Sequence, residues 1–285
     1  MSKSTHFIGH PLLGQLLSLI DQVDVHRISK KHGGEHYVKH FDAWHHLVTM
    51  LYAIIMRFDS LREIQLSMTA ESRKLSHLGL TKIPKRSTLS DANVRRSEVI
   101  FGELYATLYD KHKGVLSSDS RNRGSTASWL RKLKIMDSTT ISLFSNLVFK
   151  GVGRNPKRGK KKLISLLTND FEMPQQDIID IYRKRWMIET LFKQLKQNFP
   201  LRYFYGESAN AIKIQVWCTL IANLLLMLIK RSVRRSWSFS GLATMIRILM
   251  MYYVNYKSIL EYPEKDWDLM IEEVIRPPNH LSLFD

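Results

Sequence analysis

The stretch Tyr182–Leu201, YRKRWMIETLFKQLKQNFPL, decides the fold prediction because its apolar residues recur with the period of an amphipathic helix. At about 100° per residue, four polar positions fall within a stripe roughly 60° wide. These four residues are Tyr182, Arg185, Glu189 and Lys196. An adjoining apolar face carries Ile188, Leu191, Phe192 and Leu195. Such a helix is either an ordinary exposed helix or one that carries a metal-binding carboxylate among phosphate-binding groups.

The composition favours a polyanionic partner. The chain has 285 residues, of which 44% are hydrophobic, enough for one large domain or two moderate ones. Its 43 Lys and Arg residues against 26 Asp and Glu residues give a formal net charge of +17 and a pI of about 9.9. An anionic membrane surface is the competing interpretation of this charge. The single cysteine, Cys218, excludes a disulfide framework within the chain, so we expect a reducing cytoplasm.

Two segments bear on membrane association. The opening residues, MSKSTHFIGHPLLGQLL, have no long apolar core and no small-residue cleavage site, so no secretory signal is predicted. The apolar run 216–229 contains Asn223 and is shorter than the roughly 20 residues that a bilayer requires. We therefore predict a buried core helix at this run, and no membrane partner.

The first hundred or so residues have the pattern of helices. The segment 41–58 is apolar nearly all round and has Asp42 as its N-cap, and a second helix follows Ser60. After the basic turn LTKIPKRS, Thr88 and Asp91 have the spacing of a capping box, which predicts a third helix over 88–112. Two helices, a basic turn and a third helix make a helix-turn-helix-like arrangement.

The pattern changes after the polar segment 112–128, which we interpret as a linker. Apolar and polar residues alternate from Leu130 to Phe144, and a second short strand pattern follows, so 130–153 is predicted to be a hairpin. Asp137 lies in the apolar-facing register of the first strand, where an unpaired carboxylate is costly to bury. It either hydrogen-bonds its own turn at the sheet edge or binds a hard divalent cation.

Glu189 has a similar pair of interpretations. With Arg185 four residues before it and Lys193 four residues after it, Glu189 fits ordinary ion pairing on a helix surface. The alternative depends on the whole quartet, Y-x2-R-x3-E-x6-K, on one stripe. That spacing matches the Y-R-E-K signature of the IS-four family of bacterial insertion-sequence transposases, and the chain resembles this family. The match is specific because four residue types meet fixed spacings together.

Other segments extend the resemblance over most of the chain. KIMDSTTISL, around Asp137, resembles the strand that carries the first catalytic Asp of the family. The segments GHPLLGQLLSLI and PKRSTLSDANVRRS resemble the small helical domain that precedes the catalytic domain in one branch of these enzymes. The resemblance implies a ribonuclease-H-like domain with an Asp–Asp–Glu triad. The triad binds two Mg²⁺ ions, for which Mn²⁺ is a substitute, and it cuts and rejoins transposon ends.

Carried over to this chain, the resemblance makes Asp137 and Glu189 catalytic metal ligands, and it makes Tyr182, Arg185 and Lys196 contacts to DNA phosphates. Further candidate DNA contacts are Ser87, Thr88, Arg95, Arg96, Lys160 and Lys161. The alternatives are a capped helix with a charged outer face at 87–96 and a solvated loop at KRGKKK. The implied partner is the double-stranded DNA of the terminal repeats. A second copy or an intact transposase is the expected protein partner, in the cytoplasm of a bacterium at the nucleoid.

The chain departs from the family pattern between its two acids. Only 52 positions separate Asp137 from Glu189, too few for the strands that precede the last acid in the family. We infer an internal deletion between Lys162 and Leu163 that removed the second Asp, for which Asp170 is a weak stand-in. A separate pattern, His32, His36 and His40 at i, i+4 spacing, is a weak zinc candidate because glycines interrupt it and no cysteine assists.

The predicted fold class is α+β and mostly helical. A helix-turn-helix-like helical domain over 1–111 is followed by the linker 112–128, a truncated ribonuclease-H-like α/β domain over 129–273 and a tail over 274–285.

Overall fold

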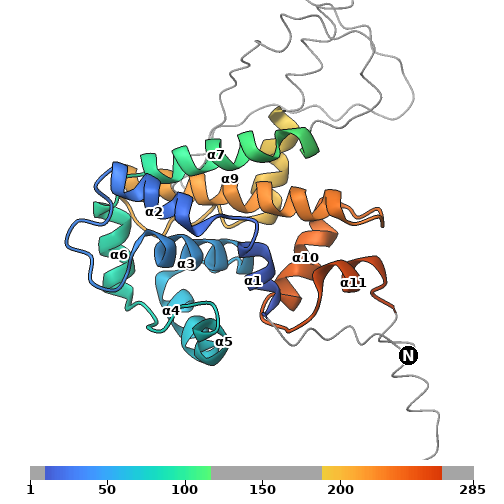
Figure 1. Ribbon diagram of the computed structural model, residues 1–285, viewed down its shortest axis with the longest axis horizontal. Coiled ribbons are helices and arrows are strands. Elements are labelled where there is room, and N and C mark those ends of the chain that lie inside the picture. Colours follow the sequence, from blue (N-terminus) through green and yellow to red (C-terminus); the bar gives the residue numbers. More distant parts are fainter. Residues whose placement is uncertain (1–9, 117–187, 265–285) are drawn as a thin grey trace, which may run out of the picture.

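The computed structural model describes residues 10–116 and 188–264, and within these ranges the chain is helical without a β-strand (Figure 1). The mostly helical character predicted from the sequence is confirmed there. The predicted hairpin and the ribonuclease-H-like sheet lie outside the described residues. The helices are α1 (Leu12–Leu17), α2 (Gln22–Lys31), α3 (Ala43–Met56), α4 (Leu61–Ala70), α5 (Ser72–Ser76), α6 (Arg86–Arg95), α7 (Val99–Leu116), an unlabelled helix over 188–198, α9 (Ala209–Ser232), α10 (Phe239–Leu249) and α11 (Tyr256–Glu261).

The N-caps of α3 and α4 confirm two local predictions. The side chain of Asp42 accepts a hydrogen bond from His45 N, and Ser60 Oγ accepts one from Glu63 N. These bonds satisfy backbone donors that the first turn of a helix leaves without partners. Helix α9 begins in the same way at Ser208, and α10 begins at Ser238.

Helix α9 is the core helix of the described bundle, as predicted for the apolar run 216–229. It packs against α3 and α7, and in Figure 1 it runs beside α7. Its length and apolar composition would let it cross a membrane, but 67% of its most apolar window is buried inside the protein. Core helices commonly have this composition, because a helix covered on all sides is apolar all round.

The N-terminal and C-terminal helices share one hydrophobic core, which includes residues from Leu12 to Leu260. The start of α1 lies against the segment after α10, where Leu12 N donates to Tyr252 O at 2.9 Å and Leu13 N donates to Met250 O at 2.9 Å. The predicted division into domains at 112–128 falls mostly outside the described residues and stays a prediction.

The predicted third helix over 88–112 is wrong, because the structure forms two helices, α6 and α7, with a break at 96–98. The N-cap of α6 is Lys85 rather than Thr88, which lies inside the helix. The break depends on Asn210 of α9. Its Nδ2 donates to the carbonyl oxygens of Asn93 and Arg96, both at 2.8 Å, and its Oδ1 accepts from Glu98 N at 3.0 Å. One distant side chain therefore satisfies both helix ends, which local sequence spacing does not reveal.

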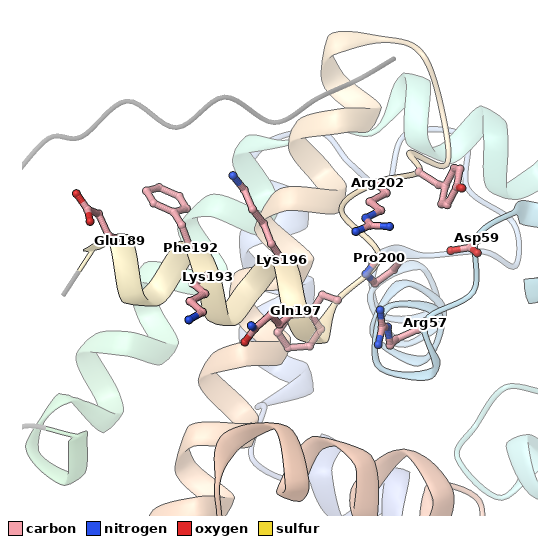
Figure 2. Close-up of a pocket in the computed structure, with 11 residues that line it drawn as sticks. Arg57, Asp59, Glu189, Phe192, Lys193, Lys196, Gln197, Pro200 and Arg202 are labelled. Carbon is pink, nitrogen blue, oxygen red and sulfur yellow. The ribbon is translucent and has the colours of Figure 1, made fainter. Parts of the chain in front are cut away.

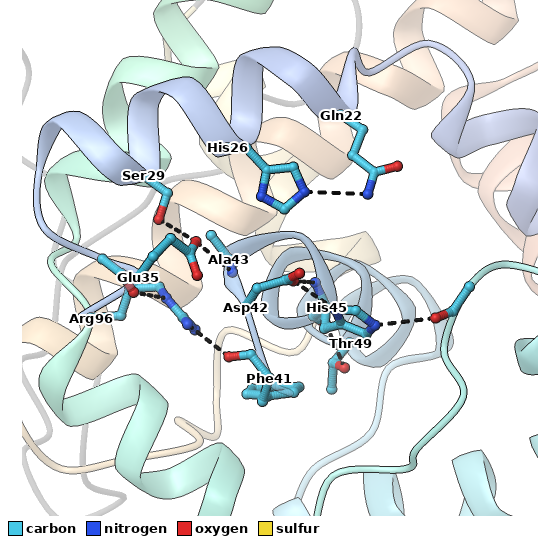
Figure 3. Close-up of polar contacts among 12 residues, drawn as sticks. Gln22, His26, Ser29, Glu35, Phe41, Asp42, Ala43, His45, Thr49 and Arg96 are labelled. Atoms are coloured by element: carbon cyan, nitrogen blue, oxygen red, sulfur yellow. Dashed lines mark hydrogen bonds and ion pairs between the residues drawn. The ribbon is translucent and has the colours of Figure 1, made fainter. Parts of the chain in front are cut away.

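Neighbouring histidines at the start of α3 have opposite pKa shifts. The hydrogen bond that the His45 ring donates to the Asp42 carboxylate raises the pKa of His45, whose Nε2 also lies 3.2 Å from Gly79 O (Figure 3). Burial would raise the pKa of Asp42, but its hydrogen bonds with His45 lower it overall. His46 is completely buried, and burial lowers its pKa to about 3.

Replacing His45 with Gln should therefore have a pH-dependent cost. Because the pKa of His45 is raised in the folded state, its protonated ring stabilises the folded chain. This stabilisation is fully present below the ordinary pKa of 6.5 and is lost as the pH rises through the folded-state pKa. The stability from the lowered pKa of Asp42 is fully present above the ordinary value of 3.8, so it is the same at both pH values used below. The difference in unfolding free energy between the native chain and His45→Gln should be larger at about pH 5.5 than at about pH 9. Urea denaturation at both pH values measures it, and the contribution of His46 cancels in the difference. An equal difference at both would contradict the prediction.

Candidate nucleic-acid interface

A groove of about 990 Å³ lies between the helix 188–198, the turn after α3 and the segment 199–203; we name it the Glu189 groove. Its charged lining residues are Arg57, Asp59, Glu189, Lys193, Lys196 and Arg202. Its remaining lining residues are Phe192, Gln197, Phe199, Pro200 and Tyr203. Four cations against two carboxylates give the groove a positive balance, which suits a phosphate-bearing ligand.

The helix 188–198 places two of the four predicted stripe residues, Glu189 and Lys196, along this groove. Figure 2 shows Glu189 and Lys196 on the same side of the helix and Lys193 on the other side. This agrees with the stripe predicted from the sequence. The helix is fixed to the bundle by the buried Leu195 and by Gln194, whose Nε2 donates to Asn223 Oδ1 of α9 at 2.6 Å.

Arg57 enters the groove from the end of α3. It has a φ of 63°, in the left-handed region that non-glycine residues adopt at an energetic cost. Arg57 N donates to Ile54 O and Phe58 N donates to Ala53 O, so the turn has the two hydrogen bonds of a Schellman motif. An arginine thus occupies the position where glycine is usual, and it projects a cation into the groove.

Arg247 of α10 lies behind the same groove. Its Nε donates to Ile55 O at 2.9 Å and its Nη2 donates to Asn198 O at 3.3 Å. Both acceptors belong to the last turn of a helix, where backbone carbonyls lack partners within the helix. Burial, and after it the charge of Arg57, lowers the pKa of Arg247. Arg247 therefore connects the two helix ends that border the groove.

Gln215 of α9 holds the segment 200–205 in place. Its Nε2 donates to Pro200 O at 3.1 Å and to Tyr203 O at 2.8 Å, and its Oε1 accepts from Tyr205 N at 2.9 Å. Tyr205 in turn donates its hydroxyl to Phe58 O at 2.7 Å, and burial raises the pKa of that hydroxyl. The two sides of the groove are therefore joined through buried and partly buried hydrogen bonds.

The described residues do not form a metal site by themselves. Glu189 and Asp59 lie at opposite ends of the groove in Figure 2. No group of three or more His, Cys, Asp or Glu side chains that could hold a metal occurs within 10–116 and 188–264. The groove thus has the chemistry of a phosphate-binding surface, with one carboxylate at each end.

A second groove, of about 770 Å³, lies between α6 and the loop 33–41; we name it the Tyr37 groove. Thr88 and Arg95 of α6 line it, together with Arg96, which follows the end of that helix. Arg95 is exposed, whereas Arg96 is 5% exposed and donates hydrogen bonds to the loop. Ser87 is exposed in the first turn of α6 and does not line the groove. The structure thus brings three of these four candidate DNA contacts together, one of them as a buried residue.

Of the other predicted site residues, Glu189 and Lys196 both line the Glu189 groove. Five lie outside the described residues, namely Asp137, Lys160, Lys161, Tyr182 and Arg185. Asp170 and the inferred deletion point between Lys162 and Leu163 lie outside them as well.

The three histidines considered for zinc have different neighbours. His32 Nε2 lies 2.7 Å from Glu103 Oε2, and His40 Nε2 lies 3.4 Å from Lys82 Nζ. The ring of His36 packs edge-on against Tyr37. Because no candidate metal group exists in the described parts of the chain, the zinc interpretation has no structural support.

The lining residues of the Glu189 groove that sequence reasoning did not identify include Arg57, Arg202 and Tyr203. Arg202 and Tyr203 follow directly after the quartet helix, so their position next to it was a usable signal. Arg57 is distant in sequence, and its only local signal was that it follows the last apolar turn of α3.

Comparisons with known proteins identify relatives for parts of the chain. Residues 8–81 match the model of a domain of unknown function, DUF4372. A candidate transposase of Sinorhizobium fredii, y4zB, is 35% identical over 178 residues, a match that covers 52% of this chain and 50% of that protein. The chain is similar to transposases of insertion sequences.

Two further relatives match shorter parts of this transposase-like chain. A candidate transposase for the element IS4SA of Synechocystis is 43% identical over 54 residues, 19% of this chain and 16% of that protein. A candidate transposase for the element IS5377 of Geobacillus stearothermophilus is 33% identical over 63 residues, 22% of this chain and 17% of that protein. No solved structure matches. The chain spans about half the length of the first of these relatives.

Proposed function

We propose that this chain is a transposase-family protein of a bacterial insertion sequence that binds transposon-end DNA. The observation that carries the proposal is the Glu189 groove, where Glu189 and Lys196 lie in one groove with Arg57, Lys193 and Arg202. Arginine binds phosphate through two parallel hydrogen bonds and lysine acts as a point charge, so the groove suits a DNA backbone. The similarity to insertion-sequence transposases is the reason for proposing transposon-end DNA as the ligand.

By the resemblance to the IS-four family, the reaction is Mg²⁺-dependent cleavage and transfer of DNA strands. Asp137 and Glu189 would hold the metal, and Tyr182, Arg185 and Lys196 would bind phosphates near the cut. Hard carboxylate ligands of this kind suit Mg²⁺. Of these two carboxylates, the described residues include only that of Glu189. We therefore derive no catalytic step through the ion.

A second candidate function is a DNA-binding remnant that recognises transposon ends without cutting them and interferes with an intact transposase. The short separation of Asp137 and Glu189 favours it, because it leaves little room for a second catalytic Asp. Loss of one bridging carboxylate leaves a pair of metal ions under-ligated.

A nicking assay separates the two functions. The substrate is a supercoiled plasmid that carries the genomic segment encoding this chain together with its flanking sequence. If the chain is an active enzyme, Mg²⁺ should support conversion to open circles, and Glu189→Gln should reduce that conversion to the level seen with a chelator. The matched control, Glu207→Gln, removes an exposed carboxylate outside the groove and should nick normally.

Binding of the same DNA without nicking would establish the remnant and exclude the enzyme. If the chain neither binds nor nicks this DNA, both candidate functions fail.

A further inference from the structure

The Tyr37 groove has a charge pattern that differs from that of the Glu189 groove. Four exposed cations line it, and no Asp or Glu from the described parts of the chain does. These cations are Lys39, Lys82, Lys85 and Arg95. The same groove is lined by half-buried apolar side chains, including Val38, Phe41 and Ile83. A groove lined by apolar side chains and by these four cations, which we call the cationic rim, suits a ligand that combines an apolar ring with negative charge.

The loop that forms one wall of this groove is held at both ends. Arg96 Nε donates to Gly34 O at 3.2 Å and Arg96 Nη2 donates to Phe41 O at 2.8 Å (Figure 3). Glu35 Oε1 accepts from Ser29 Oγ at 2.6 Å and from Ala43 N at 3.0 Å. The loop between Gly34 and Phe41 is therefore fixed by buried or half-buried polar contacts to three helices, α2, α3 and the end of α6.

Close packing also restricts the loop. A Cβ atom at Gly34 would lie 2.5 Å from Ile100 Cδ1 and 2.6 Å from Ser29 Oγ, so any larger residue there would force these two side chains of α2 and α7 to shift. Arg96 Nη1 is buried and has no hydrogen-bond partner among the described residues. A guanidinium charge with one unused nitrogen, which carries two N–H donors, therefore lies under the loop and adds to the positive field of the rim.

Tyr37 is displayed at the tip of this fixed loop. The residue is 92% exposed, and its backbone has a φ of 57°, in the left-handed region. A non-glycine residue in this region costs of order 1 kcal/mol or more, which the contacts of the surrounding loop must offset. The ring of His36 packs edge-on against the Tyr37 ring at a centroid distance of 4.5 Å. The loop thus holds an exposed aromatic face beside the cations.

We propose that the Tyr37 groove binds an unpaired nucleotide segment of DNA, with a base stacked on Tyr37 and the flanking phosphates on the cationic rim. Duplex DNA presents its charged backbone outward and keeps its bases stacked inside, so it has no apolar ring to place in a concave site. An unpaired base does, and stacking on an aromatic side chain accepts any base. The inference rests on the proposed function only for DNA as the source of the nucleotides, since the groove is separate from the Glu189 groove.

The test uses the full-length chain and fluorescence anisotropy with a labelled thymidine oligomer about eight nucleotides long, within the range of single-strand sites. Three further probes have the same length: an abasic oligomer, a blunt duplex and a uridine ribonucleotide oligomer. The thymidine oligomer should bind more tightly than the abasic one. Tyr37→Ala should weaken binding of the thymidine oligomer by about tenfold, the loss of one stacked base, and should leave the abasic oligomer and the duplex unchanged.

Two controls make the result specific. Tyr37→Phe keeps the aromatic face and should bind the thymidine oligomer as the native chain does. Tyr262→Ala removes an aromatic side chain that is 62% exposed and outside both grooves, and it should also have no effect.

Equal binding of the thymidine and abasic oligomers would overturn the inference, as would unchanged binding by Tyr37→Ala. Tighter binding of the uridine oligomer would overturn the assignment to DNA. Failure of the proposed function has a different signature: the duplex then does not bind to the native chain, whatever Tyr37 does to the single strand.

Discussion

Replacing Arg57, Lys196 and Arg202 together with Gln should weaken binding of duplex DNA by about a hundredfold, at roughly 1 kcal/mol for each lost phosphate contact. The three cations line one groove, so a DNA backbone in that groove meets all of them. The slope of log affinity against log salt concentration should become less steep by about 2.7, since each neutralised phosphate contributes about 0.9. Anisotropy titrations of duplex DNA at several salt concentrations measure both quantities.

A matched triple variant controls for net charge. Arg73, Arg231 and Lys257 are exposed cations outside both grooves. Replacing them with Gln also removes two arginines and one lysine, so the net charge changes by the same amount. This variant should keep most of the affinity and most of the salt slope. If the two triple variants lose affinity equally, the chain binds DNA through its overall charge and the Glu189 groove is not the binding surface.

Replacing Gln215 with Leu should lower the free energy of unfolding by about 3 kcal/mol. The substitution removes three hydrogen bonds and leaves the carbonyls of Pro200 and Tyr203 and the amide of Tyr205 without their partner. Each buried polar group left unpaired costs about 1–3 kcal/mol, and relaxation of the segment reduces the sum. Urea denaturation followed by circular dichroism measures the change.

The same substitution should also weaken duplex DNA binding under conditions where the variant is folded, because the segment that carries Arg202 and Tyr203 loses its anchor. For the stability measurement alone, Gln197→Leu is the matched control, since Gln197 is exposed on the helix 188–198, and it should change stability by less than about 0.5 kcal/mol. A Gln215→Leu chain as stable as the native one would show that the turn does not depend on this side chain.

The parts of the fold that were predictable are those with a strong local signal. The apolar run around Cys218 became α9, and the caps at Asp42 and Ser60 mark the starts of α3 and α4. The stripe that places Glu189 and Lys196 on one side of a helix was also readable, because helical period alone determines it.

The parts that were missed depend on contacts between distant residues. The break between α6 and α7 depends on Asn210, which is 117 positions from Asn93. Arg57 lines the Glu189 groove because its turn is held there by a hydrogen bond from the Tyr205 hydroxyl to Phe58 O, two residues that are 147 positions apart. Arg96 looked like a surface cation in the sequence, but its side chain is buried and donates hydrogen bonds to both ends of the loop that carries Tyr37. Residue spacing carries no information on such pairs.

The Asn210 contact also has a consequence for the order of folding during synthesis. The ribosome releases residues in sequence at about 5–20 residues per second, so α6 and α7 leave it well before α9. Until Asn210 emerges, no side chain from α9 satisfies the carbonyls of Asn93 and Arg96. Chains stalled before α9 should therefore be cleaved by protease near 96–98, and chains stalled after it should be protected. Early protection would mean that the first helices hold this bend without help from the second half of the chain.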